Sequence, residues 1–172
     1  MMLETPKYIF RFLMFAFAQT LIIGQLDFGL DIHPMIYPFF ILILPFEINT
    51  IWAMIIAFLM GIFVDFFMNT FGLHASAALI IAYLRPQIFS FFAPRDGYDN
   101  FRSPTIQSLG YRWFLSVSGL VILFHHFWFF LLEQFKFSDI LIILKKTILS
   151  GIISIVIFLI THTIFFKRNI SS

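Results

Sequence analysis

The sequence predicts an all-α fold, a polytopic membrane helix bundle with six transmembrane segments and a short, Pro-broken second segment. Long runs without charged residues are the main reason. Residues 113–132 and 147–166 are each 20 residues without Asp, Glu, Lys or Arg. At a rise of about 1.5 Å per residue, a helix of that length matches the roughly 30 Å hydrocarbon core of a bilayer. Only 12% of the residues are charged, too few to cover the surface of a soluble domain of this size.

The first segment, residues 8–26, follows Lys7 and Arg11 and so resembles the start of a secretory signal peptide. Ala16-Phe17-Ala18 even has the spacing of a cleavage site. However, only the short apolar run 12–15 separates Arg11 from that site, whereas a signal peptide needs about 7–15 apolar residues. We therefore expect an uncleaved first transmembrane helix.

The second segment, residues 30–46, contains Pro34, Pro38 and Pro45. Each proline removes a backbone donor and disfavours helix in the residue before it. Backbone groups freed in this way must be satisfied inside the protein when lipid surrounds it. We therefore expect a short, broken or re-entrant helix that neighbouring helices shield.

The remaining segments are residues 48–67, 73–92, 111–132 and 142–166. Pro86 predicts a kink or an end late in the fourth of the six. The longest polar stretch, residues 93–110, is too short to build a hydrophobic core of its own. We therefore expect one integral membrane domain over residues 1–172.

The basic residues predict the orientation. With six spans and both termini inside, eight of the 11 basic residues lie on the cytoplasmic side, and only Lys136, Lys145 and Lys146 lie outside. This agrees with the positive-inside rule. If the second segment did not cross, Arg85, Arg95, Arg102 and Arg112 would move outside and the distribution would oppose the rule.

Small residues recur at every fourth position of the third segment. Ala53, Ala57 and Gly61 form a row along one helix face, and Asp65 continues it. Such rows let helices approach closely in lipid. We interpret this row, together with Gly72 in the following turn, as a candidate helix-packing surface. Docking of a partner's transmembrane helix on the same row is the alternative.

Asp65 lies near the end of the third segment, before a polar cluster that contains Asn69, Thr70 and His74. Intramembrane acids tend to be functional because a charge at the bilayer centre costs about 2.5–3.5 kcal/mol on insertion scales. At this depth we expect an interfacial carboxylate that organises the turn between two helices. A proton, ligand or partner role is the alternative.

Other polar residues indicate no catalytic site. His125 and His126 point about 100° apart on a regular helix, so they cannot both ligate one metal, and we expect packed, hydrogen-bonded histidines. No phosphate-binding loop, nucleophile elbow or zinc-protease motif occurs, so we expect neither an enzyme nor a cofactor. The other intramembrane polar residues are scattered over three segments and do not require a shared pocket: Gln19, Thr20, Gln25, Ser150, Ser154, Thr161 and His162.

The polar turn at residues 94–100 carries Arg95, Asp96 and Tyr98. A solvated cytoplasmic loop is the simplest interpretation. The three residues are also candidates for contact with anionic headgroups or with a cytoplasmic partner.

Residues 57–65, followed by Asn69-Thr70-Phe71-Gly72-Leu73-His74-Ala75, resemble the signature of the bacterial rod shape-determining MreD family. In that family a Gly-x-x-x-Asp helix end precedes a glycine turn into the next helix. Residues 82–86 and 94–98, and His125-His126 leading to Glu133, are similar to the variant of the Bacteroidetes lineage. The resemblance covers most of the chain and is clearest over residues 53–100.

The resemblance implies a non-catalytic scaffold or regulator of cell elongation in the bacterial inner (cytoplasmic) membrane. Its expected partner is MreC, and through MreC the filament protein MreB, a SEDS glycosyltransferase and a class B penicillin-binding transpeptidase. Together these proteins control cell shape and lateral peptidoglycan synthesis. The expected surroundings are the lipid bilayer, without nucleic acid, and association into a homo-oligomer stays open.

The MreD family is also structurally akin to the S-components of energy-coupling-factor vitamin transporters. This kinship supplies the rival hypothesis, a small-molecule-binding transporter subunit. S-components typically carry an Ala-x-x-x-Ala docking motif in the first helix. Here Thr20 follows Ala16 at that spacing, which weakens the rival.

Overall fold

The computed structural model describes residues 5–26, 28–29, 31–95, 97–98, 104–135 and 137–165. Every regular element in these ranges is helical. In chain order the elements are α1 (Thr5–Phe17), the π-helical turn η2 (Ala18–Ile22), the 3₁₀ turn η3 (Ile23–Gln25), α2 (Pro38–Leu42), α3 (Thr50–Met68), α4 (Leu73–Phe91), α5 (Ile106–Gln134), the 3₁₀ turn η4 (Phe137–Asp139) and α6 (Ile140–Phe165).

Four stretches are helical, long and apolar enough to cross a membrane: Pro6–Gln25, Thr50–Met68, Ile106–Gln134 and Ile140–Thr163. This is consistent with a membrane protein. α2 is too short to cross as a helix, and α4 is less apolar because its second half carries Arg85, Pro86 and Gln87. Six crossings therefore stay a prediction.

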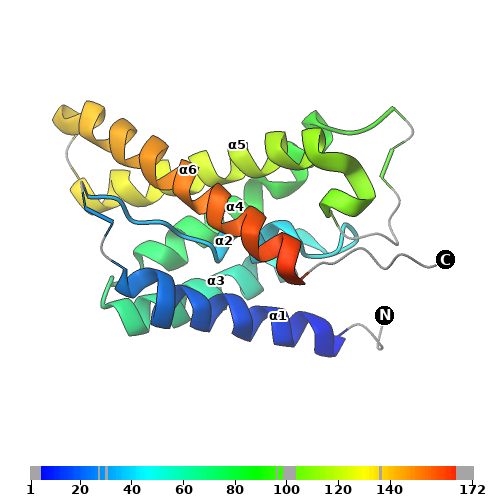
Figure 1. Ribbon diagram of the computed structural model, residues 1–172, viewed down its shortest axis with the longest axis horizontal. Helices are drawn as coiled ribbons and strands as arrows, with labels where there is room; N and C mark the ends of the chain where they lie inside the picture. The colour runs from blue at the N-terminus through cyan, green and yellow to red at the C-terminus, as the bar shows by residue number, and fades with distance from the viewer. Residues whose placement is uncertain are drawn as a thin grey trace.

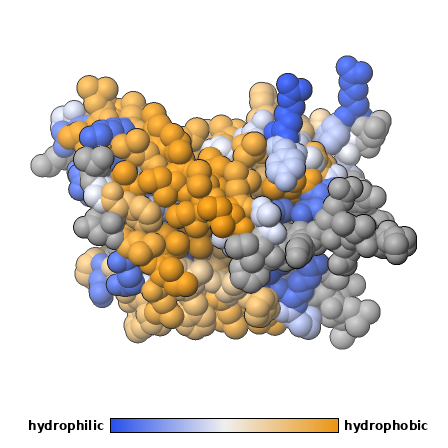
Figure 2. All heavy atoms as spheres, in the orientation of Figure 1, coloured by the Kyte–Doolittle hydropathy of each residue, from blue (hydrophilic) through white to orange (hydrophobic). Residues whose placement is uncertain are grey.

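The helices lie along one long axis of the molecule, and the start of α1 and the end of α6 are at the same end (Figure 1). In the view of Figure 2, apolar residues dominate the middle of the surface and hydrophilic ones gather at the two ends. This is the surface that a bilayer core requires, because lipid-facing side chains need no polar groups. Many large apolar side chains are accordingly exposed, among them Phe66, Phe91 and Leu141.

The second segment is broken, as its prolines predict. Between Asp31 and Ile36 it forms no helix, and the short helix α2 then begins at Pro38. All residues from Met35 to Leu44 are buried. Phe39 stacks on Phe158 of α6 with ring centroids 3.7 Å apart. The segment is therefore an internal element of the bundle, shielded by its neighbours.

Helix ends deviate from the predicted boundaries at proline and glycine. α4 contains Pro86 within the helix and continues to Phe91. α5 begins at Ile106, earlier than residue 111, but Gly110 interrupts it with a φ of 80°. A capping box between Thr105 and Ser108 starts this first turn. The main part of α5 therefore begins after Gly110, close to the predicted position.

α3 and α4 form a tightly packed hairpin. Ala53, Ala57 and Gly61 of α3 are buried. A Cβ atom added to Gly61 would lie 2.6 Å from the nitrogen of Ala75 and 2.7 Å from the carbonyl oxygen of His74. Only glycine leaves room for so close an approach of two backbones. The small-residue row is therefore used within the chain and is not free for a partner's helix.

Candidate functional site

The candidate site is built around the extended part of the second segment. Its backbone cannot pair with itself, and side chains of the flanking helices replace the missing partners. Ser150 and Ser154 of α6 accept the N–H groups of His33 and Met35 at 3.0 and 2.8 Å. Gln19 of η2 accepts the N–H of Ile36 at 2.7 Å and donates to the carbonyl of Pro34 at 3.3 Å. These bonds hold an extended backbone inside an apolar bundle, where an unpaired group would cost several kcal/mol.

Tyr37 is the hub of the network. It is fully buried, and its hydroxyl oxygen lies 2.6 Å from Nε2 of His125. The same oxygen lies 3.2 Å from Nδ1 of His74 and 3.2 Å from the backbone oxygen of that residue. One phenolic group thus connects the second segment to α4 and α5. Its position between Pro34 and Pro38 is the only sequence signal that singles it out.

His126 continues the network toward α6. Its Nδ1 lies 2.9 Å from the carbonyl oxygen of Ile122, and its Nε2 lies 3.1 Å from the hydroxyl of Ser154. Both His125 and His126 are fully buried. They are packed, hydrogen-bonded histidines, as the sequence predicts.

Arg85 binds the other end of the second segment. Its side chain is 4% exposed, and one terminal nitrogen donates to the carbonyls of Leu42, Leu44 and Pro45. The guanidinium lies over the ring of Phe89, 4.5 Å from the centroid. Cations are favourable at a helix C-terminus, and these carbonyls follow the end of α2. Arg85 therefore holds α2 against α4.

The spacing of the intramembrane polar residues did not require a shared location, yet the structure brings an important subset of them together. Gln19, Ser150, Ser154, His125 and His126 all surround residues 33–37. Their spacing along the chain gave no sign of this, because the common point is the backbone of a segment that carries few polar side chains. The network therefore has a structural role, because its side chains form hydrogen bonds with the second segment of the same chain.

Asp65 organises the turn between α3 and α4. Its carboxylate accepts hydrogen bonds from the Thr70 hydroxyl at 2.6 Å and from the backbone N–H groups of His74 and Ala75 at 3.0 and 2.9 Å. It therefore caps the positive N-terminus of α4. Gly72, with a φ of 91°, supplies the left-handed conformation that directs the chain into that helix.

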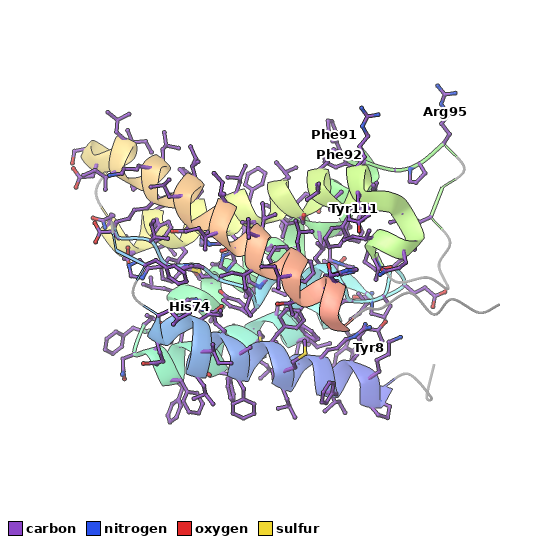
Figure 3. All side chains as sticks on the ribbon, in the orientation of Figure 1. Tyr8, His74, Phe91, Phe92, Arg95 and Tyr111 are labelled. Carbon is purple, nitrogen blue, oxygen red and sulfur yellow. The ribbon has the colours of Figure 1, made fainter. Side chains whose placement is uncertain are left out.

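The polar loop after α4 is tied down by aromatic residues. The hydroxyl of Tyr98 donates to the carbonyl of Phe89 at 2.7 Å and accepts from the indole of Trp113 at 3.1 Å. Its ring stacks on Phe46 with centroids 4.5 Å apart. Partial burial raises the pKa of Tyr98, and the Trp113 hydrogen bond acts against that rise. Tyr98 thus anchors the loop inward, whereas Arg95 projects into solvent (Figure 3). Asp96 lies outside the described residues.

Figure 3 also shows how these groups are distributed along the bundle. His74 lies toward one end. The other labelled residues lie toward the opposite end, where α1 begins: Tyr8, Phe91, Phe92, Arg95 and Tyr111. Aromatic and basic side chains gathered at one end are typical of a membrane–water interface.

The class that this fold and network define is an all-helical protein with four helices long and apolar enough to cross a membrane and with an internal, broken segment. Within the described residues no group of three or more His, Asp or Glu side chains is placed to hold a metal ion. No family model matches the chain, and no curated protein or solved structure matches it.

Proposed function

We propose that this chain is an MreD-like, non-catalytic scaffold of the cell-elongation machinery in the bacterial inner membrane. The observation that supports the proposal is the α3–α4 hairpin. The residues that carry the MreD resemblance are the residues that lock it, namely Gly61, Asp65, Gly72, His74 and Ala75. Residues that serve the geometry of a helix hairpin rather than a chemical step suit a protein that presents surfaces to partners.

In this proposal the chain crosses the membrane six times, with the second segment and α4 as the two crossings of lower hydropathy. Both termini and the loop after α4 are cytoplasmic, and the α3–α4 turn faces the opposite side. The start of α1 and the end of α6, which lie at the same end in Figure 1, support this arrangement, as does the excess of basic residues assigned to that side.

A partner's transmembrane helix would dock on exposed helix faces, because the small-residue row is buried. α3 offers such a face, with Trp52, Leu59 and Phe66 all more than half exposed. In the proposal MreC contacts this kind of surface, and MreB, the glycosyltransferase and the transpeptidase join through MreC.

The test is co-purification of a tagged copy from native membranes, followed by identification of the proteins recovered. We expect MreC to be recovered and depletion of the chain to give rounded cells. A matched pair of variants sharpens the result. Gly61→Leu should open the hairpin and lower MreC recovery, whereas Gly119→Leu, at a position with open space around it, should not.

The rival hypothesis predicts a different set of proteins. A vitamin-transporter subunit would recover an energy-coupling ATPase module and no MreC. That outcome would reject the scaffold and support the transporter.

A further inference from the structure

A cavity of about 260 Å³ lies at the end of the bundle that is opposite the start of α1. The end of η3, the extended part of the second segment, the α3–α4 turn and the last turns of α5 surround it. Its polar lining residues are Gln19, His33, Thr70, His74 and Glu133, and Met35 and Phe129 belong to its apolar wall. A water molecule occupies about 30 Å³ in the liquid, so the cavity has room for roughly nine non-hydrogen atoms.

His74 is a wall residue with an unsatisfied atom. Its side chain is 1% exposed, and its Nε2 has no hydrogen-bond partner among the described residues. The single phenolic proton of Tyr37 can go to His125 Nε2 at 2.6 Å or to the His74 carbonyl at 3.2 Å, and in either case it is not available to His74 Nδ1. His74 Nδ1 then donates to the Tyr37 oxygen at 3.2 Å. In an uncharged imidazole the other nitrogen is an acceptor, so Nε2 of His74 needs a donor.

Among the other polar wall groups, Gln19 is engaged with the backbone of the second segment, and Thr70 and Glu133 offer acceptors. The Thr70 hydroxyl gives its proton to Asp65 and keeps free lone pairs. Glu133 contributes a carboxylate, and its partner Lys146, at 3.6 Å, is not a wall residue. None of the residues that line the cavity, all of them in the described part of the chain, is Lys or Arg. With the Asp65 carboxylate behind Thr70 and His74, the surroundings favour a positively charged donor.

We propose that this cavity binds a small organic ammonium ion whose charged group faces Glu133 and His74 and whose apolar part packs on Met35 and Phe129. Aromatic faces such as Phe129 also attract cations. The site goes beyond the proposed scaffold and does not depend on it, because MreC recovery and ligand binding are separate measurements.

The probe is 2-phenylethylammonium, which has nine non-hydrogen atoms, and the anion 3-phenylpropionate is the charge control. Purified protein in lipid nanodiscs is titrated with each compound by calorimetry, and the melting temperature is followed in parallel. We expect saturable binding and a raised melting temperature with the cation only. Loss of one charge-assisted hydrogen bond should weaken affinity about tenfold, the equivalent of about 1.4 kcal/mol.

Two pairs of variants locate the site. Glu133→Gln should weaken binding of the cation, and Asp139→Asn, a carboxylate at the same end but outside the cavity lining, should not. His74→Phe should weaken binding, and His126→Phe, at a buried histidine outside the cavity lining, should not. If the histidine variants fail to fold, the Glu133 pair still decides the question. Absence of saturable binding, equal binding of the anion, or equal affinity in Glu133→Gln and Asp139→Asn would overturn the proposal.

Discussion

The Asp65 carboxylate accepts the backbone N–H of Ala75 at 2.9 Å, ten residues further along the chain. One helical turn before Asp65, the α-carbon of Gly61 lies against the same residue. The Asp65 carboxylate and the missing side chain of Gly61 thus both concern the same residue of α4, Ala75. The carboxylate binds the helix end, and the glycine lets the backbones come close enough for that bond. This relationship motivates the first two predictions.

Asp65→Asn should lower stability by about 1–3 kcal/mol, the usual effect of leaving a buried donor unpaired. An amide has only one acceptor oxygen, and the carboxylate now serves three donors. The thermal midpoint in detergent, followed by circular dichroism, measures the change. A variant that keeps its midpoint and still recovers MreC, yet fails to prevent rounded cells, would instead indicate a charge or proton role for Asp65.

Gly61→Ala should destabilise the protein by about 1–3 kcal/mol, because even a methyl group would collide with the backbone of α4. Gly61→Leu should destabilise the protein more than Gly61→Ala does, and also more than Asp65→Asn does. The control is Gly119→Ala in α5, where nothing lies within 4 Å of the added Cβ and helix propensity favours alanine by up to about 1 kcal/mol. If both alanine variants melt at the same temperature, the close approach of α3 and α4 is wrong.

Tyr37→Phe should destabilise the bundle by about 1–3 kcal/mol while keeping its aromatic packing. The loss of the hydroxyl leaves His125 Nε2 and His74 Nδ1 without their shared partner. Tyr83→Phe, on an exposed position of α4, is the matched control and should change little. Melting curves of the two variants side by side test the network, and equal curves would argue against Tyr37 as its hub.

Because the chain contains no cysteine, single cysteines can report its topology. Ser138→Cys, in the exposed turn between α5 and α6, should react with a membrane-impermeant thiol reagent in intact cells. Ser103→Cys lies outside the described residues but within the loop after α4, and it should react only after permeabilisation. Labelling of position 103 in intact cells would reject the six-crossing arrangement.

The sequence by itself determined the all-helical fold with long apolar helices and the broken second segment, and it singled out the third-segment row as a packing surface with partner docking as the alternative. Each follows from local physics. Uncharged runs match the bilayer thickness, prolines remove backbone donors, and small residues at every fourth position favour close helix packing. The glycine and the carboxylate of the row could therefore be assigned before their partner in α4 was known.

Only the tertiary structure decided what the scattered polar residues do. Gln19 and Ser154 are 135 residues apart in the chain, yet both bind residues 33–36 of the second segment. Pattern analysis compares side chains within one helix. Here the side-chain oxygens of Gln19 and Ser154 accept backbone N–H groups of another segment, and a backbone N–H group has no sequence signature. The cavity beside His74 arises in the same way, because its wall is assembled from several distant elements whose ends meet only when the bundle closes.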